Sequence, residues 1–350
     1  MKIRKASFFE APDFFLSEWE GVNRNLDAIK VGTVWEIGKS EGGRSIRAVA
    51  YGEKEPMPHD TTYSASVVGD CPEAYYDPAQ RTKPVLLIIG AIHGCELEGC
   101  VSCMNLISVM ETGADLRGRR WDALREIAMS MRLVIVPIAQ PDGRIRIGIQ
   151  NLMGGDQDDL YYYSQGVLPN GDILRWPECY RNQPRDLDQM VLLGGMYNDA
   201  GVNIQCDDFF APKVAPETRA LIDLVRDETP DCFITLHGCE EGPFFVGPND
   251  FIPQTYRYRQ AVVAALVGER HRKEGLKPEI ERVVHTTPMD GFSIQNILHD
   301  TSGALPLLFE FPLGVEEKPF TFGEIVDVGL TLYDELIRFG LTYGFRPPPA

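Results

Sequence analysis

Four short apolar runs, spread along most of the chain, constrain the fold more than any other feature of the sequence. Each run is rich in β-branched or large aliphatic residues and stops at a polar or turn-forming group, which is typical of a buried strand. Helical patterns lie between the runs, for example GCVSCMNLISVM and APETRALIDLVRDE. Strands that alternate with helices and are buried on both faces predict an α/β fold with a mostly parallel sheet. The runs are VLLIIGAI (85–92), RLVIVPIA (132–139), CFITL (232–236) and ALPLLFEF (304–311).

Two other segments differ from this pattern. VWEIGKSEGGRSIRAVAYG (34–52) contains two strand-like runs around a Gly-rich turn and predicts a hairpin at the edge of the sheet. Residues 150–210 show no sustained period, and a long irregular segment in a compact domain is usually functional or mobile. Because neither a repeat nor a convincing linker divides the chain, we expect a single domain over residues 1–350.

The charge of the chain restricts its partners. With 34 basic and 51 acidic residues the net charge is −17, so a nucleic-acid backbone or an anionic membrane surface is repelled. The N-terminal stretch lacks the apolar core of a signal peptide, and no run of about 18 apolar residues follows it. Several of the eight cysteines sit in apolar or helical patterns where reduced thiols are common. We therefore expect a soluble, cytoplasmic protein that binds neither nucleic acid nor membranes.

The tetrapeptide HGCE occurs twice, each time directly after an apolar run. In an open parallel sheet, ligands bind beyond the carboxyl ends of the strands, so both copies lie where a site is expected. His93 and Glu96 of the first copy stand three residues apart at a turn into a helix, which can bring an imidazole and a carboxylate to the same side. His237 of the second copy supplies a third ligand. Catalytic zinc commonly takes three protein ligands and leaves the fourth position to water.

Glu310 interrupts the last apolar run, in the sequence FEFP. A carboxylate among strand-forming, apolar neighbours is costly to bury without a partner. It either pairs with a buried arginine or faces the strand ends, where it can accept a proton from water on zinc, whose pKa falls to about 7. The second arrangement predicts that Glu310 is a general base.

Other chemistries find less support in the sequence. The chain has no G-x-S-x-G elbow and no Gly-rich phosphate loop, which argues against serine hydrolase and nucleotide chemistry. Cys100 and Cys103 form a CxxC without the second pair of a zinc ribbon, so we expect buried small residues there. Cys95 stands two residues from His93, a spacing that seldom aligns a thiol with a base for proton transfer.

Several motifs, taken in order, resemble those of the zinc carboxypeptidases of the M14 superfamily. HGCE, QPDG, LHG and FEFP are similar to that family's HxxE, NPDG, strand-end His and late-strand Glu. IGKSEGGRSI resembles its IGxSxEGRxI, and APETRALIDLV its SEPETxAL helix. The likeness runs from about residue 30 to 345. It implies a mixed, mostly parallel eight-stranded sheet between helices. It also implies one zinc ion on His93, Glu96 and His237, with Glu310 as the general base.

The same resemblance implies residues that bind substrate, with two departures. The family polarises the scissile carbonyl with an arginine in a WRKN-like segment, which Arg181 matches in CYRNQP. The Asn–Arg pair of the family's GVDLNRNF grips the substrate's terminal carboxylate, but Gln205 and Cys206 replace it in GVNIQCDDF, and a thiol cannot make an arginine's bidentate salt bridge. The substrate-covering tyrosine has no counterpart in ERVVHTTPMDGFSIQ. The candidates to replace the missing clamp are Arg144, Arg146 and Arg185.

The function that the sequence predicts is zinc-dependent hydrolysis of an amide bond, with a metallocarboxypeptidase acting on peptides as the first interpretation. The changed Gln205 and Cys206 positions keep open a deacylase or amidohydrolase of N-acyl amino acids, nearer the aspartoacylase and succinylglutamate desuccinylase branch. A zinc-binding relative without turnover, which recognises a peptide or a partner, also stays open. The missing clamp and tyrosine favour that relative, whereas Glu310 and Arg181 argue against it.

Overall fold

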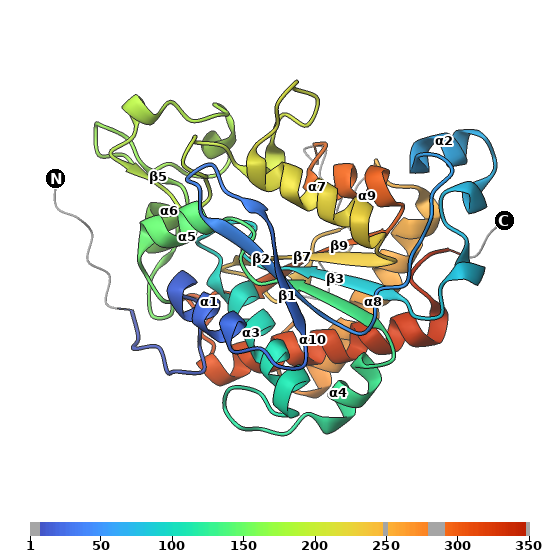
Figure 1. Cartoon of the computed structure of the whole chain (residues 1–350). Helices are drawn as coiled ribbons and strands as arrows, with labels where there is room; N and C mark the ends of the chain where they lie inside the picture. Colours follow the sequence, from blue (N-terminus) through green and yellow to red (C-terminus); the bar gives the residue numbers. More distant parts are fainter. Residues whose placement is uncertain (1–7, 248–250, 279–290, 348–350) are drawn as a thin grey trace.

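The computed structural model describes residues 8–247, 251–278 and 291–347 of the chain (Figure 1). A mixed seven-stranded sheet crosses the centre of these residues, in the order β1–β2–β4–β3–β7–β9–β8. Helices pack on both of its faces. The strands are β1 (Thr33–Lys39), β2 (Ser45–Tyr51), β3 (Val85–Ile89), β4 (Arg132–Val136), β7 (Cys232–Cys239), β8 (Phe244–Phe245) and β9 (Leu305–Pro312).

The four apolar runs form the central strands, which confirms the sequence prediction. β4, β3, β7 and β9 pair in parallel, whereas the β1–β2, β2–β4 and β8–β9 pairs are antiparallel. Every residue of β3 is buried, as expected of a strand that is covered on both faces. The predicted edge hairpin is formed by β1 and β2. The resemblance implied an eight-stranded sheet. Within the described residues the main sheet has seven strands, with β1 at one edge and the two-residue strand β8 at the other.

Different helices cover the two faces of the sheet (Figure 1). Successive side chains of β3 point to opposite faces of the sheet and so contribute to both hydrophobic cores. Leu86 and Ile88 face one layer of helices, and Leu87 and Ile89 face the other. The first layer consists of α3 (Leu97–Thr112), α4 (Asp122–Ala128), α8 (Gln254–Lys273) and α10 (Phe322–Tyr343), and the second of α7 (Pro216–Glu228) and α9 (Ile294–Ser302). Within the described ranges, no helix combines the length and apolar character that a bilayer span requires.

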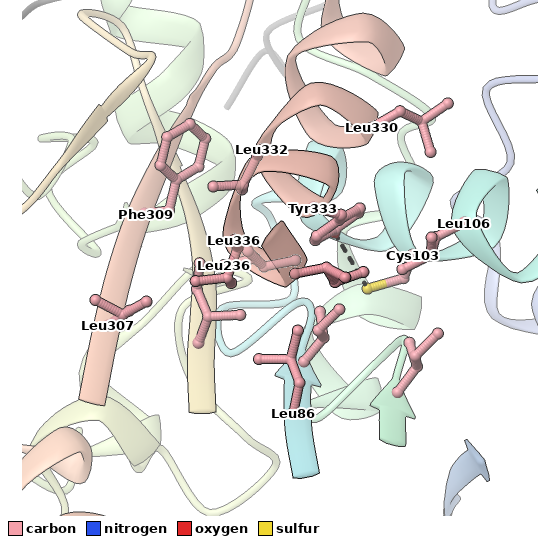
Figure 2. Close-up of a cluster of buried hydrophobic side chains, with 14 of the residues drawn as sticks. Leu86, Cys103, Leu106, Leu236, Leu307, Phe309, Leu330, Leu332, Tyr333 and Leu336 are labelled. Atoms are coloured by element: carbon pink, nitrogen blue, oxygen red, sulfur yellow. Dashed lines mark hydrogen bonds between the residues drawn. The ribbon is translucent and has the colours of Figure 1, made fainter. Parts of the chain in front are cut away.

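The first core is closely packed between the sheet, α3 and α10. Figure 2 shows strand side chains such as Leu236 and Phe309 facing this layer of helices. The hydroxyl of Tyr333 on α10 is buried there and is satisfied by Ser102 Oγ at 2.6 Å, with Cys103 Sγ at 3.9 Å. Cys103 and its CxxC partner Cys100 are fully buried free thiols, as the sequence predicted.

The irregular segment predicted at 150–210 contains only short elements. A two-stranded ribbon of β5 and β6 lies apart from the main sheet. The elements of this segment are α6 (Gln157–Ser164), β5 (Gly166–Val167), the 3-10 helices η3 (Glu178–Tyr180), η4 (Leu187–Gln189) and η5 (Ile204–Cys206), and β6 (Leu192–Leu193). The remaining helices are α1 (Trp19–Asp27), α2 (Tyr63–Val68), α5 (Pro141–Ile147), η1 (Pro72–Ala74) and η2 (Pro78–Gln80).

Asp142 of the QPDG motif ties three loops together. Its carboxylate is fully buried and accepts hydrogen bonds from the Ser40 hydroxyl and the Gly42 backbone N–H of the β1–β2 turn. It also accepts from the Arg44 guanidinium at 2.8 Å and from the backbone N–H of Asp199 at 3.1 Å. A buried carboxylate with this many donors is well compensated for its lost hydration. The QPDG and IGKSEGGRSI motifs therefore hold the loops beside the carboxyl ends of the strands.

Candidate metal centre

His93, Glu96 and His237 come together at the carboxyl ends of β3 and β7. These strands pair in parallel, so the turn after β3 and the end of β7 lie at the same edge of the sheet. Nδ1 of His93 lies 2.7 Å from Oε1 of Glu96, and Nδ1 of His237 lies 3.0 Å from Oε2 of the same carboxylate. All three residues are buried, and their candidate ligand atoms lie within 4.8 Å of one another. The two HGCE copies thus meet in space.

The backbone of the first HGCE holds its side chains in a tight turn. The backbone N–H of Glu96 donates to the carbonyl oxygen of His93 at 3.1 Å, and α3 begins at the next residue. Gly94 is needed in this turn, because a Cβ atom there would lie 2.1 Å from the backbone nitrogen of Arg144. Its own N–H donates to the carbonyl oxygen of Gly195 at 2.9 Å. The imidazole and the carboxylate are therefore fixed by main-chain contacts on both sides.

Burial and charge act against each other in this cluster. Burial raises the pKa of the Glu96 carboxyl, but the imidazoles of His93 and His237 outweigh it and hold that pKa well below its usual range. Burial likewise lowers the pKa of His93, but the Glu96 carboxylate outweighs it, and the net pKa is raised. For His237 burial dominates and the pKa is lowered. An anionic carboxylate and a neutral imidazole are the forms in which these side chains bind a metal ion.

The donor set fits a zinc ion. Two imidazole nitrogens and a carboxylate oxygen make up a common catalytic zinc site. Glu96 Oε2 is buried and lacks a partner in hydrogen-bonding geometry among the described residues, although Nδ1 of His237 lies 3.0 Å away. Buried polar atoms without partners are rare, and a cation between the three side chains would satisfy this one. No other group of three His, Cys, Asp or Glu side chains in the described part of the chain converges in this way.

Asn203 lies behind His93, and the sequence analysis gave it no role. It is fully buried, and its Oδ1 lies 3.0 Å from Nε2 of His93. The same oxygen accepts the backbone N–H of Gln205 at 3.0 Å. Because an amide oxygen only accepts, this contact places a proton on Nε2 and turns Nδ1 toward Glu96. One signal points to Asn203, since the pattern GVDLNRNF has an aspartate at its position in GVNIQCDDF.

We expect Asn203→Leu to weaken zinc binding by about 10–100-fold, the usual cost of removing a hydrogen-bond partner of a metal-binding histidine. Without the acceptor, the imidazole of His93 is free to turn and to change tautomer. Competition with a chromophoric chelator measures the affinity. Asn203→Asp is the matched control, because it keeps an acceptor of the same shape and should keep tight binding. Wild-type zinc affinity in the leucine variant would show that Asn203 does not orient His93.

Glu310 lies beside His237 on the neighbouring strand. The parallel register of β7 and β9 pairs these two residues, and side chains paired in this way leave the sheet on the same face. Phe309 and Phe311, on either side of Glu310, point into the opposite core against α3 and α10. Glu310 itself is half-buried. The structure therefore places a carboxylate beside His237, one of the three candidate metal ligands.

Arg181 and its neighbour Tyr180 point in different directions. The Arg181 side chain is 70% exposed, and its Nη2 lies 3.2 Å from Oε1 of Glu178. The structure does not bring this guanidinium into the buried cluster, and its role stays a prediction. Tyr180 instead lines a half-open cavity. Burial raises the pKa of its hydroxyl.

The three arginines considered for the missing clamp are bonded to the protein itself. Arg144 is buried, and its guanidinium donates to the backbone carbonyls of Gly94 and Ile149. It thereby supports the HGCE turn from behind. Arg146 and Arg185 also donate to backbone carbonyl groups. A substrate carboxylate has to compete with these bonds, and the substrate-binding role of Arg144 stays a prediction.

Gln205 and Cys206 line the same cavity as Tyr180, which has a volume of about 520 Å³. This volume is within the range of small-molecule sites. Gln205 links this cavity to the candidate metal ligands, because its backbone N–H donates to Asn203, which contacts His93. Leu308, which also lines it, is two residues from Glu310 on β9 and so shares its face of the sheet.

Comparisons with known proteins agree with this geometry. A family model described as zinc carboxypeptidase, of the M14 peptidases, matches residues 30–260, a range that contains the three candidate ligands and ends before Glu310. A metallo-carboxypeptidase from Burkholderia cenocepacia is 15% identical, with a TM-score of 0.57 over 92% of this chain and 68% of that chain. A metallo-carboxypeptidase from Pseudomonas aeruginosa in complex with (2-guanidinoethylmercapto)succinic acid is 14% identical, with a TM-score of 0.55 over 91% and 67%.

A third solved structure, the carboxypeptidase A from Helicoverpa armigera, is 14% identical, with a TM-score of 0.52 over 93% of this chain and 73% of that chain. A comparison with curated protein sequences found no match. At these identities the solved structures show a shared fold. The family model covers more than half of the chain, and the chain therefore belongs to the zinc carboxypeptidase family of M14 peptidases.

Proposed function

We propose that this protein is a zinc-dependent metallopeptidase, with one zinc ion, that hydrolyses an amide bond of a peptide within a single catalytic domain. One observation carries the proposal. His93, Glu96 and His237 converge in a buried cluster, and Glu310 lies in register with His237 on the adjacent strand. Three protein ligands with a neighbouring carboxylate provide what metal-assisted hydrolysis needs, which is a bound electrophile and a base.

The residues of this chain divide the proposed reaction among them. His93, Glu96 and His237 would hold the zinc ion, which when bound would supply Lewis-acid chemistry for hydrolysis. Glu310 accepts the proton of the attacking water and passes it to the nitrogen of the leaving amine. Arg181 is the predicted donor to the developing oxyanion, and to reach it the guanidinium has to turn away from Glu178.

A deacylase of N-acyl amino acids is the second candidate function. The observation that favours it is the uncharged pair Gln205 and Cys206 in the cavity, at the positions of the family's Asn–Arg clamp. A zinc-binding protein without turnover is less well supported, because such a protein has no use for Glu310 next to the cluster.

Product analysis by mass spectrometry tests the proposal. Zinc-loaded protein is incubated with a panel of free peptides, C-terminally amidated peptides and N-acyl amino acids. We expect new peptide fragments that disappear when 1,10-phenanthroline removes the zinc and return when zinc is added back. Cleavage confined to the N-acyl amino acids would replace the peptidase with the deacylase. If none of the compounds in the panel were cleaved, both hydrolase functions would be contradicted.

A further inference from the structure

No charged side chain of the described residues lines the cavity that contains Tyr180 and Gln205. None of its lining residues in the described ranges is a lysine, arginine, histidine, aspartate or glutamate. Its walls come from the segment around Tyr180, from β9 at Leu308, from the start of α9 and from α8. A carboxylate transferred from water into such a cavity would lose its hydration without gaining a cation.

Two glutamine side chains that line this cavity, Gln205 and Gln295, are hydrogen-bonded to each other through their amides. Gln205 Nε2 donates to Gln295 Oε1 at 2.8 Å, and Gln295 Nε2 donates back to Gln205 Oε1 at 3.3 Å. The Gln295 amide has no donor or acceptor left, because it also donates to Thr235 Oγ1 at 2.7 Å and accepts from Ser293 Oγ at 2.8 Å. Among the described residues, the Gln205 side chain bonds only to Gln295. One of its amide N–H groups and one lone pair of its amide oxygen remain available. A donor beside an acceptor matches another amide, whereas a carboxylate can only accept.

Aromatic side chains gather beside this cavity in numbers that are unusual for a surface exposed to water. Phe292 lines the cavity, and its ring centroid lies 5.3 Å from that of Phe210 and 5.7 Å from that of Phe251. Phe210 is 79% exposed, Trp176, which also lines the cavity, is 56% exposed, and Phe251 is 55% exposed. We call Trp176, Phe210, Phe251 and Phe292 the aromatic rim. Clustered exposed aromatics indicate a binding surface for an apolar group.

The charges of the metal centre do not make up for the missing cation. Glu96 belongs to the cluster itself, and Glu310 lies in register with the candidate ligand His237. A divalent ion at the cluster would be balanced by these two carboxylates, so no surplus positive charge is left for a substrate carboxylate. The net charge of −17 adds long-range repulsion of anions.

We propose that this cavity binds an uncharged part of the substrate, namely an apolar or aromatic group next to a neutral amide, and discriminates against a free carboxylate there. The inference rests on the proposed function and deepens it, because it names the substrate class. The preferred peptide carries an amide or a further peptide bond at the position where the family pattern expects a terminal carboxylate.

Binding measurements on the zinc-loaded Glu310→Gln protein and on the zinc-free wild-type protein test the inference without turnover, and the zinc-free protein keeps the charge of Glu310. The two probes are N-acetylphenylalanine amide and N-acetylphenylalanine, which differ only in the charged group, and titration calorimetry at neutral pH compares them. We expect the amide to bind at least about tenfold more tightly. Gln205→Met should reduce this preference, because the variant fills the same space without a donor or an acceptor. Leu308→Met is the matched control, since Leu308 lines the same cavity and the exchange leaves every amide of the lining in place.

Each other outcome is decisive. Equal or tighter binding of the carboxylate probe would overturn the inference, and so would equal losses of preference in Gln205→Met and Leu308→Met. Phe210→Ser should weaken both probes. If it instead changes the oligomeric state and leaves probe binding intact, the aromatic rim is a contact between copies and the apolar part of the inference is wrong. Tight amide binding with silence in the product analysis would refute the hydrolase and keep the cavity chemistry. Removal of residues from free C-termini alone would support the hydrolase and overturn the proposed preference of the cavity.

Discussion

Replacing Glu310 with glutamine should lower kcat for peptide hydrolysis by about 10²–10⁴-fold while the protein keeps its zinc. Glutamine has the shape of glutamate, but its amide cannot take a proton from water at neutral pH. Glu310 lies beside the three candidate ligands rather than among them, so the metal is expected to stay. Steady-state kinetics give kcat and KM, and elemental analysis of the same preparation gives the zinc content. A large fall in kcat with little change in KM is the expected signature of a lost base.

Glu240→Gln is the matched control for that experiment. Glu240 belongs to the second HGCE, and its Oε1 accepts a hydrogen bond from the Gln157 side chain at 2.9 Å. That bond survives in the variant if the new amide turns its oxygen toward Gln157, so we expect kcat close to that of the wild type. Wild-type kcat in Glu310→Gln would remove Glu310 from the mechanism. An equal loss in both variants would show that any lost acidic group near the end of β7 disturbs turnover.

The central strands could be predicted from the sequence because burial on both faces leaves few polar positions in them. β3, for example, is an unbroken run of buried aliphatic residues. The strands β5, β6 and β8 could not be predicted in the same way, because each has two residues and a period needs several residues to be visible. Their positions depend on pairing partners that lie elsewhere in the chain.

The candidate metal ligands could be predicted because strand ends and a three-residue spacing are local features of the sequence. His93 and Glu96 share one turn, and His237 ends a strand that pairs with β3. Asn203 is different, since its contact with His93 joins positions 110 residues apart. That contact depends on how the loop before η5 folds back, which no short pattern reports.

The side chains that meet substrate were harder to predict for a related reason. Tyr180 and Arg181 are adjacent residues at the end of η3, in a segment without a sustained period. Without a period, the sequence does not tell which of two neighbours faces the cavity, and in the structure it is the tyrosine. Most of the segment that lacks the family's tyrosine, residues 281–295, lies outside the described residues.

Glu96→Gln should weaken zinc binding by more than the 10–100-fold typical of losing a partner behind a ligand, because it changes a ligand itself. A neutral amide oxygen is a poorer zinc ligand than a carboxylate, and the charge that Glu96 places between His93 and His237 is lost. Turnover should fall in step with bound zinc and recover only partly when zinc is added in excess. Chelator competition measures the affinity, and kcat/KM as a function of added zinc measures the recovery.

Glu98→Gln shows whether the effect belongs to the ligand or to any buried glutamate at the start of α3. Glu98 is fully buried two residues further along the helix, and burial raises the pKa of its carboxyl to about 8. The variant keeps the shape and the burial of this side chain and leaves the three candidate ligands unchanged. We expect Glu98→Gln to bind zinc like the wild type. If it lost zinc as completely as Glu96→Gln, the cause would be a disturbed helix start, and the assignment of Glu96 as a ligand would lose its support. Wild-type zinc affinity in Glu96→Gln would contradict that assignment directly.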